Sequence, residues 1–337
     1  MTIGRDQRLF VAAQNLVLFN ELEKVLQIFI GAGVLVIVLK GAALANTVYG
    51  SIGNRPMNDV DLLIHPQDRK RIMPILEMNG YQIKPWPQRK FHPYNISATS
   101  EIDIIAKTGT VFDLHWDLIS FEWVRLMARL DMQALWQSAQ PFNMNGLQVL
   151  QLSPYDNLLH ICLHLMMQAY AHQIAYQDIV ALLKTYQPFP WDEFLERASV
   201  SRTCTTCYFA LETAASELGA AVPLPVLDQL RPPSWKKWLV HRISDPIKGL
   251  RGEIISGDRK YLVQLVAADR AIDVARVLLW LFLPGPAWLA ERYGLKNGLQ
   301  TWLACFWHPF IILSRGLRGL FQVLANPGRS GTRKLYD

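Results

Sequence analysis

The sequence contains few cysteines, few charged residues and no long uninterrupted apolar run. Four cysteines among 337 residues are too few for a disulfide scaffold, so we expect free thiols, no disulfide partner and a cytoplasmic protein. No apolar stretch reaches the roughly 20 residues that a bilayer-spanning helix needs. Residues 6–30 mix charged and apolar residues at helical spacing, which predicts an amphipathic helix and not a signal peptide.

The remaining composition is typical of a folded protein. Hydrophobic residues make up 51% of the chain and charged residues 18%, which excludes a disordered chain. Lys and Arg together number 34, and Asp and Glu number 28, which gives a net charge of +6. This charge favours a phosphate-bearing ligand, a nucleic acid or an anionic membrane surface, and it does not choose among them.

Short β-rich segments separated by Gly and Pro fill the N-terminal part. Helices are predicted between them, from Gly41 to Gly50 and from Pro66 to the Asn79-Gly80 stop. This alternation indicates a mixed α/β unit that ends near residue 150. The predicted strands are "VLVIVL" (34–39), "VDLLIH" (60–65), "YQIK" (81–84), "YNISAT" (94–99), "EIDIIA" (101–106) and "VFDLHWDL" (111–118).

From Ser153 the pattern becomes helical. Ser153 is a candidate N-cap with Pro154 at the first helical position, and we expect an all-helical part over 151–275. Cys204 and Cys207 form a C-x-x-C in one of these helices, without a second pair of metal ligands nearby. We therefore interpret them as buried thiols and not as a zinc site.

Residues 276–337 form an apolar, basic helical tail that is rich in Trp and Phe. Pro284 and Pro286 interrupt one of its apolar runs, and His308 and Pro309 interrupt the other. One interpretation is an interfacial helix that makes peripheral contact with the inner membrane surface, its basic residues facing anionic lipid: Arg315, Arg318, Arg329, Arg333 and Lys334. The alternative is a helical cap packed on the body of the protein.

Two aspartates stand one residue apart in "GNRPMNDVDLLIHPQD" (53–68), at the start of an apolar run. On a strand, Asp59 and Asp61 would project from the same face, about 7 Å apart. Two carboxylates placed in this way repel each other, so the spacing favours a cation bound between them.

A strand-to-helix turn, "VLKGAALA" (38–45), precedes this pair. Gly41 lets an anion approach the backbone N–H groups at the start of the helix, where negative charge is favoured. Lys40 adds a mobile cation. The turn therefore predicts a phosphate-binding site.

A third carboxylate is expected from a later strand, where Asp113 and Asp103 are rivals. We favour Asp113 because it shares a strand face with another polar residue, His115. Phe112 and Leu114 point the other way, into the core. One wet face and one dry face are what a strand that lines a cleft requires.

The order "LKG", then R-x-x-x-D-x-D-L-L, resembles the polymerase-β-like nucleotidyltransferases. Along nearly the whole chain the sequence resembles the uncharacterised nucleotidyltransferase family of bacteria, through "DLHWDL", "SPYDNLLHICLHL", "YQDIVALL", "FPWDEFLERA" and "LFLPGPAWLAERYGL". The resemblance implies an α+β fold. It comprises a polymerase-β-like nucleotidyltransferase domain with a mixed sheet (1–150), an all-helical C-terminal domain (151–275) and the tail (276–337).

The resemblance also implies a two-metal site. Asp59 and Asp61 would bind both Mg²⁺ ions, with Mn²⁺ as an alternative metal. Asp113 would bind only the ion that activates the acceptor hydroxyl, and would help to remove its proton. His115 would either shuttle a proton or hold Asp113 by a hydrogen bond, and both roles stay open.

For the phosphates, the resemblance implies a cradle at Gly41 and Ala42, beside Lys40. Ala42 stands where many relatives of the wider fold carry Ser, so one hydroxyl contact to phosphate is lost. Arg55 would reach a phosphate or would pair with Asp59, and both roles stay open.

The implied activity is transfer of a nucleoside monophosphate from an NTP, with ATP as the expected donor, and release of pyrophosphate. The acceptor is open among a small molecule, a peptide, a protein and a tRNA. The alternatives are a toxin–antitoxin or regulatory nucleotidyltransferase and a non-catalytic nucleotide-binding module. His160 and His164 lack the Glu of H-E-x-x-H, which excludes metalloprotease chemistry, and their place in the cleft, like that of Asp178, stays open.

Overall fold

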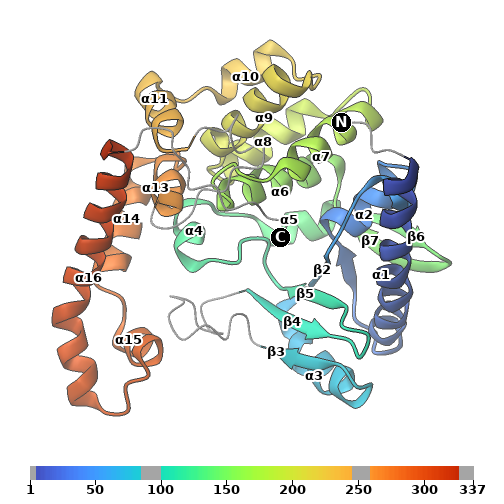
Figure 1. The fold of residues 1–337 in the computed structure, drawn as a ribbon, viewed down its shortest axis with the longest axis horizontal. Helices are drawn as coiled ribbons and strands as arrows, with labels where there is room; N and C mark the ends of the chain where they lie inside the picture. The colour runs from blue at the N-terminus through green and yellow to red at the C-terminus, as the bar shows by residue number, and fades with distance from the viewer. Residues whose placement is uncertain (1–4, 85–99, 245–258, 326–337) are drawn as a thin grey trace. The chain divides into compact units, whose positions relative to one another are not determined.

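The computed structural model describes residues 5–84, 100–244 and 259–325. Contacts divide the chain into two compact units (Figure 1). The first unit combines the described residues up to Phe121 with Asp131–Asn157, and the second combines Glu122–Leu130 with the described residues from Leu158 onward. The domain boundaries expected at residues 150 and 275 stay a prediction.

Seven strands of the first unit form one mixed sheet, in the order β3-β4-β5-β2-β1-β7-β6. β2 pairs parallel with β5 and β1 pairs parallel with β7, while the other neighbours are antiparallel. The strands are β1 (Val36–Val38), β2 (Asp59–Ile64), β3 (Gln82–Lys84), β4 (Glu101–Ile105), β5 (Val111–His115), β6 (Gln140–Met144) and β7 (Leu147–Gln151).

Helices cover one face of this sheet. The helical elements of the unit are α1 (Arg5–Gly31), α2 (Lys40–Thr47), α3 (Arg69–Met78) and α5 (Met132–Ser138), with 3₁₀ turns at Ile52–Asn54 and Pro66–Asp68. Apolar residues of α1 and α3 share a core with alternate residues of β2 and β5: Leu22, Leu26, Phe29, Ile72, Leu76, Val60, Leu62, Ile64, Phe112 and Leu114. Since side chains alternate along a strand, the intervening residues of β2 and β5 project from the opposite face. The dry face predicted from Phe112 and Leu114 is present.

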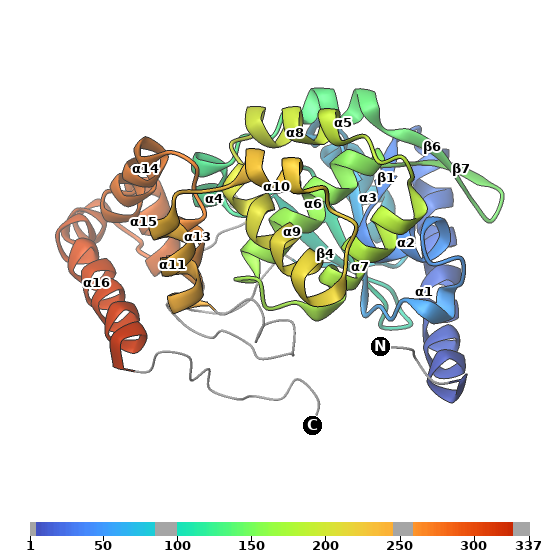
Figure 2. The same ribbon diagram turned by 90° about the horizontal axis from the view of Figure 1, so that it is seen from above.

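The hairpin of β6 and β7 is an element that the sequence analysis missed (Figure 2). Its turn consists of Asn145 and Gly146, with φ of 51° and 88°. Asn-Gly is the strongest short-range signal for such a two-residue turn, because both positions need positive φ. β7 pairs with β1, so the hairpin extends the sheet beyond the predicted strands. The strand expected at 94–99 lies outside the described residues.

The second unit is helical throughout its described residues. The predicted N-cap is confirmed, since the Ser153 hydroxyl accepts a hydrogen bond from the Asp156 N–H at 3.2 Å where α6 begins. The mixed sheet of the first unit and the helices of the second together confirm the α+β class. The helices are α4 (Glu122–Met127), α6 (Pro154–Met167), α7 (Gln173–Thr185), α8 (Trp191–Val200), α9 (Cys204–Leu218), α10 (Leu224–Leu230), α11 (Ser234–Ile243), α13 (Arg259–Val266), α14 (Ala271–Phe282), α15 (Pro286–Tyr293) and α16 (Gly298–Ala325).

Candidate active site

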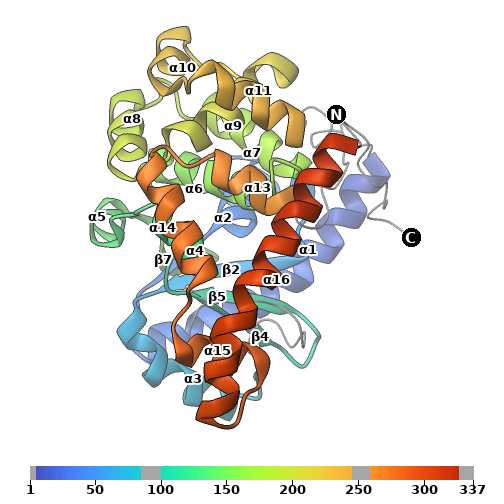
Figure 3. The same cartoon turned by 90° about the vertical axis from the view of Figure 1, so that its left-hand side faces the viewer.

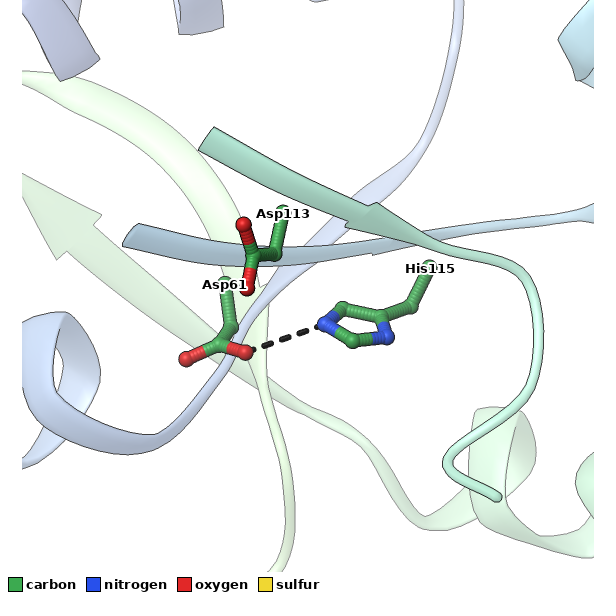
Figure 4. A group of neighbouring side chains, drawn as sticks. All are labelled: Asp61, Asp113 and His115. Atoms are coloured by element: carbon green, nitrogen blue, oxygen red, sulfur yellow. Dashed lines mark hydrogen bonds and ion pairs between the residues drawn. The ribbon is translucent and has the colours of Figure 1, made fainter. Parts of the chain in front are cut away.

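Two parallel strands bring three polar side chains together on the sheet face opposite the core (Figure 4). Asp61 of β2 lies opposite Asp113 of β5, and His115 follows on the same face of β5. One ligand atom from each of these three residues lies within 4.8 Å of the other two. The sequence analysis singled out all three. Their proximity depends on strand register, which no local pattern reports.

Two cationic groups converge on one oxygen of the buried Asp61 carboxylate. Lys40 Nζ donates to Oδ1 at 2.6 Å, and His115 Nε2 lies 3.0 Å from the same atom, as the dashed line in Figure 4 marks. Burial alone would raise the pKa of Asp61, but the charges of Lys40 and His115 outweigh it and hold this pKa well below its usual value. Asp61 is therefore ionised.

His115 also contacts Glu101, a residue that the sequence analysis did not single out as a site residue. Nδ1 of His115 lies 3.2 Å from Glu101 Oε2, and the Ser120 hydroxyl donates to that oxygen. Burial disfavours a charged imidazole, but the contacts with Asp61 and Glu101 raise the pKa of His115 to about 10. The hydrogen bond of His115 Nε2 runs to Asp61 and not to Asp113. The register Glu101↔His115 explains the contact, and Glu101 shares its strand face with Asp103.

Three acids line up across neighbouring strands, because Asp103 of β4 lies opposite Asp113, which lies opposite Asp61. Burial and the negative charge of Asp61 raise the pKa of Asp113 to about 7. Burial and the charge of Glu101 raise the pKa of Asp103 to about 6. Asp113 is the direct neighbour of Asp61, whereas Asp103 is one strand further away. The choice of Asp113 as third carboxylate stays a prediction, which this register favours.

Asp59 is exposed at the first residue of β2 and shares a strand face with Asp61. Partial loss of water contact and the charge of Asp61 raise the pKa of Asp59, against the opposing charges of Lys40 and Arg55. The 4.8 Å cluster found among the described residues does not include Asp59. Arg55 is buried, and its Nη1 donates to the Pro56 carbonyl at 2.6 Å.

The residues expected to face phosphate form the first turn of α2. Lys40 begins the helix with a φ of 42°, a left-handed conformation that is strained for any residue except glycine. Gly41 and Ala42 are both buried. A Cβ atom on Gly41 would lie 2.8 Å from Met57 Sδ and 3.2 Å from Arg55 Nη1, so glycine is needed for the close approach of these side chains. The phosphate role of this turn stays a prediction.

The donor set suits a hard divalent cation. Mg²⁺ prefers carboxylate oxygens, and Asp61 and Asp113 offer them from adjacent strands. The charge of Asp61 raises the pKa of Asp113, so a cation between these two groups would relieve their repulsion. Asp61 and Asp113 therefore fit a divalent cation, and the expected part of Asp59 in such a site stays a prediction. His115 completes this cluster, and its ring nitrogens contact the Asp61 and Glu101 carboxylates.

The other polar residues that the sequence left open belong to α6 and α7. His160 and Asp178 are buried, and the His164 ring packs edge-on against His172 with ring centroids 4.9 Å apart. Their role towards a nucleotide stays open. The four cysteines are free thiols. Cys207 is buried in α9 as expected, whereas Cys204 is partly exposed, so the expectation that both are buried is wrong for Cys204.

A mixed sheet with paired carboxylates beside a strand-to-helix turn is the architecture of the nucleotidyltransferase class. Residues 5–219 match the model of the family described as uncharacterised nucleotidyltransferases, and the chain belongs to this family. The resemblance to this family noted in the sequence is thereby confirmed over residues 5–219. A search of curated proteins finds no match to the chain.

Several solved structures are similar to the chain, among them the following two. One is the solution structure of the antibiotic-resistance factor ANT(2'')-Ia, at 13% identity and a TM-score of 0.33, covering 66% of this chain and 94% of that chain. The other is an antigenic nucleotidyltransferase-like protein from Paracoccidioides brasiliensis, at 16% identity and a TM-score of 0.34, covering 68% of this chain and 93% of that chain.

Proposed function

We propose that the protein is a Mg²⁺-dependent enzyme that transfers a nucleoside monophosphate from an NTP, with ATP as the donor, to an acceptor. The observation that carries the proposal is the register of β2 and β5, which sets Asp61 directly opposite Asp113. Membership of a nucleotidyltransferase family supports the reaction class. The ionised state of Asp61 supports its use as a metal ligand.

In the proposed reaction, bound Mg²⁺ supplies charge neutralisation at the phosphates and lowers the pKa of the acceptor hydroxyl. Asp113 accepts the acceptor's proton, while the acceptor atom forms a bond to the α-phosphorus. The bond from that phosphorus to the oxygen bridging to the β-phosphate breaks, and pyrophosphate leaves. Asp59 and Asp61, on the neighbouring strand β2, would bind the Mg²⁺. His115 keeps Asp61 oriented through its 3.0 Å contact.

Lys40 and Arg55 supply positive charge for the triphosphate. Burial lowers the pKa of Lys40, but the contact with Asp61 raises it by more, so the ammonium stays charged. Its position at the first residue of α2 lets a phosphate compete with Asp61 for this ammonium. The buried Arg55 guanidinium lies beside Gly41, at the same turn.

The acceptor is one of several classes, namely a small molecule, a peptide, a protein or a tRNA. A toxin–antitoxin or regulatory enzyme would use a protein or tRNA acceptor with the same residues. A non-catalytic module would bind NTP and transfer nothing. The positively charged chain is compatible with all of these, so the acceptor must be found by experiment.

Calorimetric titration of Mg²⁺-NTP tests the site. Asp59→Asn and Asp61→Asn are expected to weaken binding by roughly tenfold or more, since each removes one ligand charge. Asp103→Asn, on a strand that does not contact β2, is the matched control and is expected to bind as the wild type does. Wild-type affinity in the Asp59→Asn/Asp61→Asn double variant would show that the site is misplaced.

Transfer is then tested by incubating wild-type protein with α-phosphate-labelled NTPs, Mg²⁺ and fractionated cell extract. Label that moves to an acceptor together with release of pyrophosphate supports the proposal, and the labelled class distinguishes a small molecule from a protein or tRNA. Tight binding without transfer to any fraction would favour the non-catalytic module.

A further inference from the structure

Helix α16 presents a continuous apolar stripe to solvent. Ten large apolar side chains of this helix are exposed, at spacings of three and four residues that place them on one side. Phe310 is 71% exposed and Phe321 is 70% exposed. The ten residues are Leu299, Trp302, Leu303, Phe306, Trp307, Phe310, Leu313, Leu317, Leu320 and Phe321.

The opposite side of α16 is the packed one. Ala304 and His308 are buried, and the helix contacts α13, α14 and α15, beside which it runs in Figure 3. α14 also exposes apolar residues, with Ile272 at 56% and Leu279 at 62%. The stripe is thus on the solvent side of α16, and the helix packs on α13, α14 and α15 through its other side.

Exposed apolar surface of this extent is unusual for a protein that meets only water. Single exposed apolar residues are normal, but a contiguous patch marks a surface for a protein or a membrane. None of the described helices is long and apolar enough to cross a bilayer. The stripe runs along the side of α16, so a bilayer would meet it with the helix axis parallel to the membrane surface.

The charge of the tail distinguishes the candidate occupants. α16 contains no Asp or Glu. Exposed basic residues lie beside the stripe, with Lys296 just before the helix and Arg318 next to Leu317 of the stripe. Residues 276–337 contain only two acids, Glu291 and Asp337, against eight bases: Arg276, Arg292, Lys296, Arg315, Arg318, Arg329, Arg333 and Lys334.

A second copy of the chain would fit this charge pattern poorly. A two-fold pairing of the stripe with itself would bring basic residues from both copies together, and α16 offers no carboxylate to pair with them. An anionic lipid surface supplies the missing negative charge. It also accommodates Trp and Phe side chains at the level of the headgroups.

We propose that the apolar stripe of α16 binds the surface of an anionic lipid bilayer, with the helix lying in the plane of the membrane. Apolar side chains such as Phe306 and Phe310 enter the boundary between headgroups and acyl chains, while Lys296 and Arg318 contact anionic headgroups. This places the nucleotidyltransferase family member at a membrane surface through the side of one helix. The inference does not depend on the proposed reaction.

Co-sedimentation of the full chain with lipid vesicles tests the inference. Vesicles that contain about one third phosphatidylglycerol are expected to bind the protein roughly tenfold more tightly than pure phosphatidylcholine vesicles, and added salt is expected to weaken this binding. Phe306→Ser/Phe310→Ser is expected to abolish sedimentation on both vesicles. Lys296→Gln/Arg318→Gln is expected to remove only the preference for the anionic lipid.

The matched control is Leu9→Ser/Phe10→Ser, which changes two exposed apolar residues of α1, each 63% exposed, and is expected to bind as the wild type does. Circular dichroism checks that each variant is folded, which is expected because all substituted residues are exposed. Equal vesicle binding by wild type and Phe306→Ser/Phe310→Ser would overturn the inference. A wild-type protein that stays off vesicles, and forms dimers that this double variant abolishes, would also overturn it in favour of a second copy.

Discussion

Lys40 Nζ lies 2.6 Å from Asp61 Oδ1, although the two residues come from different elements of the first unit. The Leu39 N–H donates to the Asp61 carbonyl at 3.0 Å, so the start of α2 is fixed to β2. Lys40 has a left-handed backbone, which costs energy and persists only where the surroundings support it. The ammonium thus neutralises the carboxylate that a divalent cation would neutralise in the loaded enzyme.

Lys40→Met is therefore expected to lower the stability of the metal-free protein by about 3 kcal/mol, because the buried Asp61 loses one of its two cationic partners. Mg²⁺ is expected to raise the thermal midpoint of Lys40→Met by more than it raises that of the wild type, since no ammonium competes for Asp61. Lys40→Arg keeps the charge and serves as the control. An equal Mg²⁺ effect on wild type and Lys40→Met, measured by thermal denaturation, would mean that metal and Lys40 do not compete.

Asp113→Asn is expected to spare NTP binding, which Asp59 and Asp61 support, and to reduce transfer by about 10²-fold to 10⁴-fold through loss of the proton acceptor. Asp103→Asn is the matched control, since it makes the same change one strand further from Asp61. It is expected to leave the transfer rate within about twofold of wild type, as for substitutions that do not touch the reacting groups. Single-turnover rates with labelled NTP measure both. An inactive Asp103→Asn beside an active Asp113→Asn would exchange the two assignments.

Much of this site can be predicted from the sequence, because it depends on local patterns. The D-x-D spacing places Asp59 and Asp61 on one strand face, and the alternation around Asp113 separates a wet face from a dry one. Both patterns have a period of two residues, so they assign side chains to a strand face without any knowledge of tertiary contacts. The alternation of polar and apolar residues therefore predicts which residues share a strand face.

The rest depends on contacts between segments distant in sequence. Glu101 is adjacent to His115 only because β4 pairs antiparallel with β5, and the sequence does not specify that register. For the same reason the sequence does not predict that His115 contacts Asp61 and not Asp113. The β6–β7 hairpin is different, because Asn145-Gly146 is a local turn signal from which the sequence alone predicts it.

Gly41→Ala is expected to reduce stability, because its Cβ would lie 2.8 Å from Met57 Sδ. The expected cost is about 1–3 kcal/mol, as for other overpacked sites. Gly41→Ala is expected to cost less in a Met57→Ala background than in the wild type, since the clashing atoms belong to the Met57 side chain. Denaturant unfolding measures the stability and calorimetry measures the NTP affinity of the single and double variants. If the effect of Gly41→Ala on NTP affinity shrinks together with its effect on stability, Gly41 is needed for packing against Met57 and not for the approach of a phosphate.

His308 of α16 forms hydrogen bonds to α14 and α15 that fit a neutral imidazole. Its Nε2 lies 2.9 Å from the Leu281 carbonyl, which can only accept, so Nε2 carries the hydrogen. Its Nδ1 lies 2.7 Å from the Tyr293 hydroxyl and accepts from it. Burial lowers the pKa of His308, and the charge of Arg292 lowers it further. A neutral imidazole therefore satisfies both partners.

Since the folded state holds His308 below its unfolded pKa, stability from this contact is fully present above about pH 6.5 and is lost as the pH falls through the folded pKa. The slope is expected to reach at most about 1.4 kcal/mol per pH unit, the value for one proton. His308→Gln, which keeps one donor and one acceptor, is expected to remove this slope. His241→Gln, at an exposed position of α11, is the matched control and is expected to retain it. Thermal denaturation from pH 7.5 to about 5 measures all three proteins. An unchanged acid slope in His308→Gln would show that protonation of other groups weakens the fold.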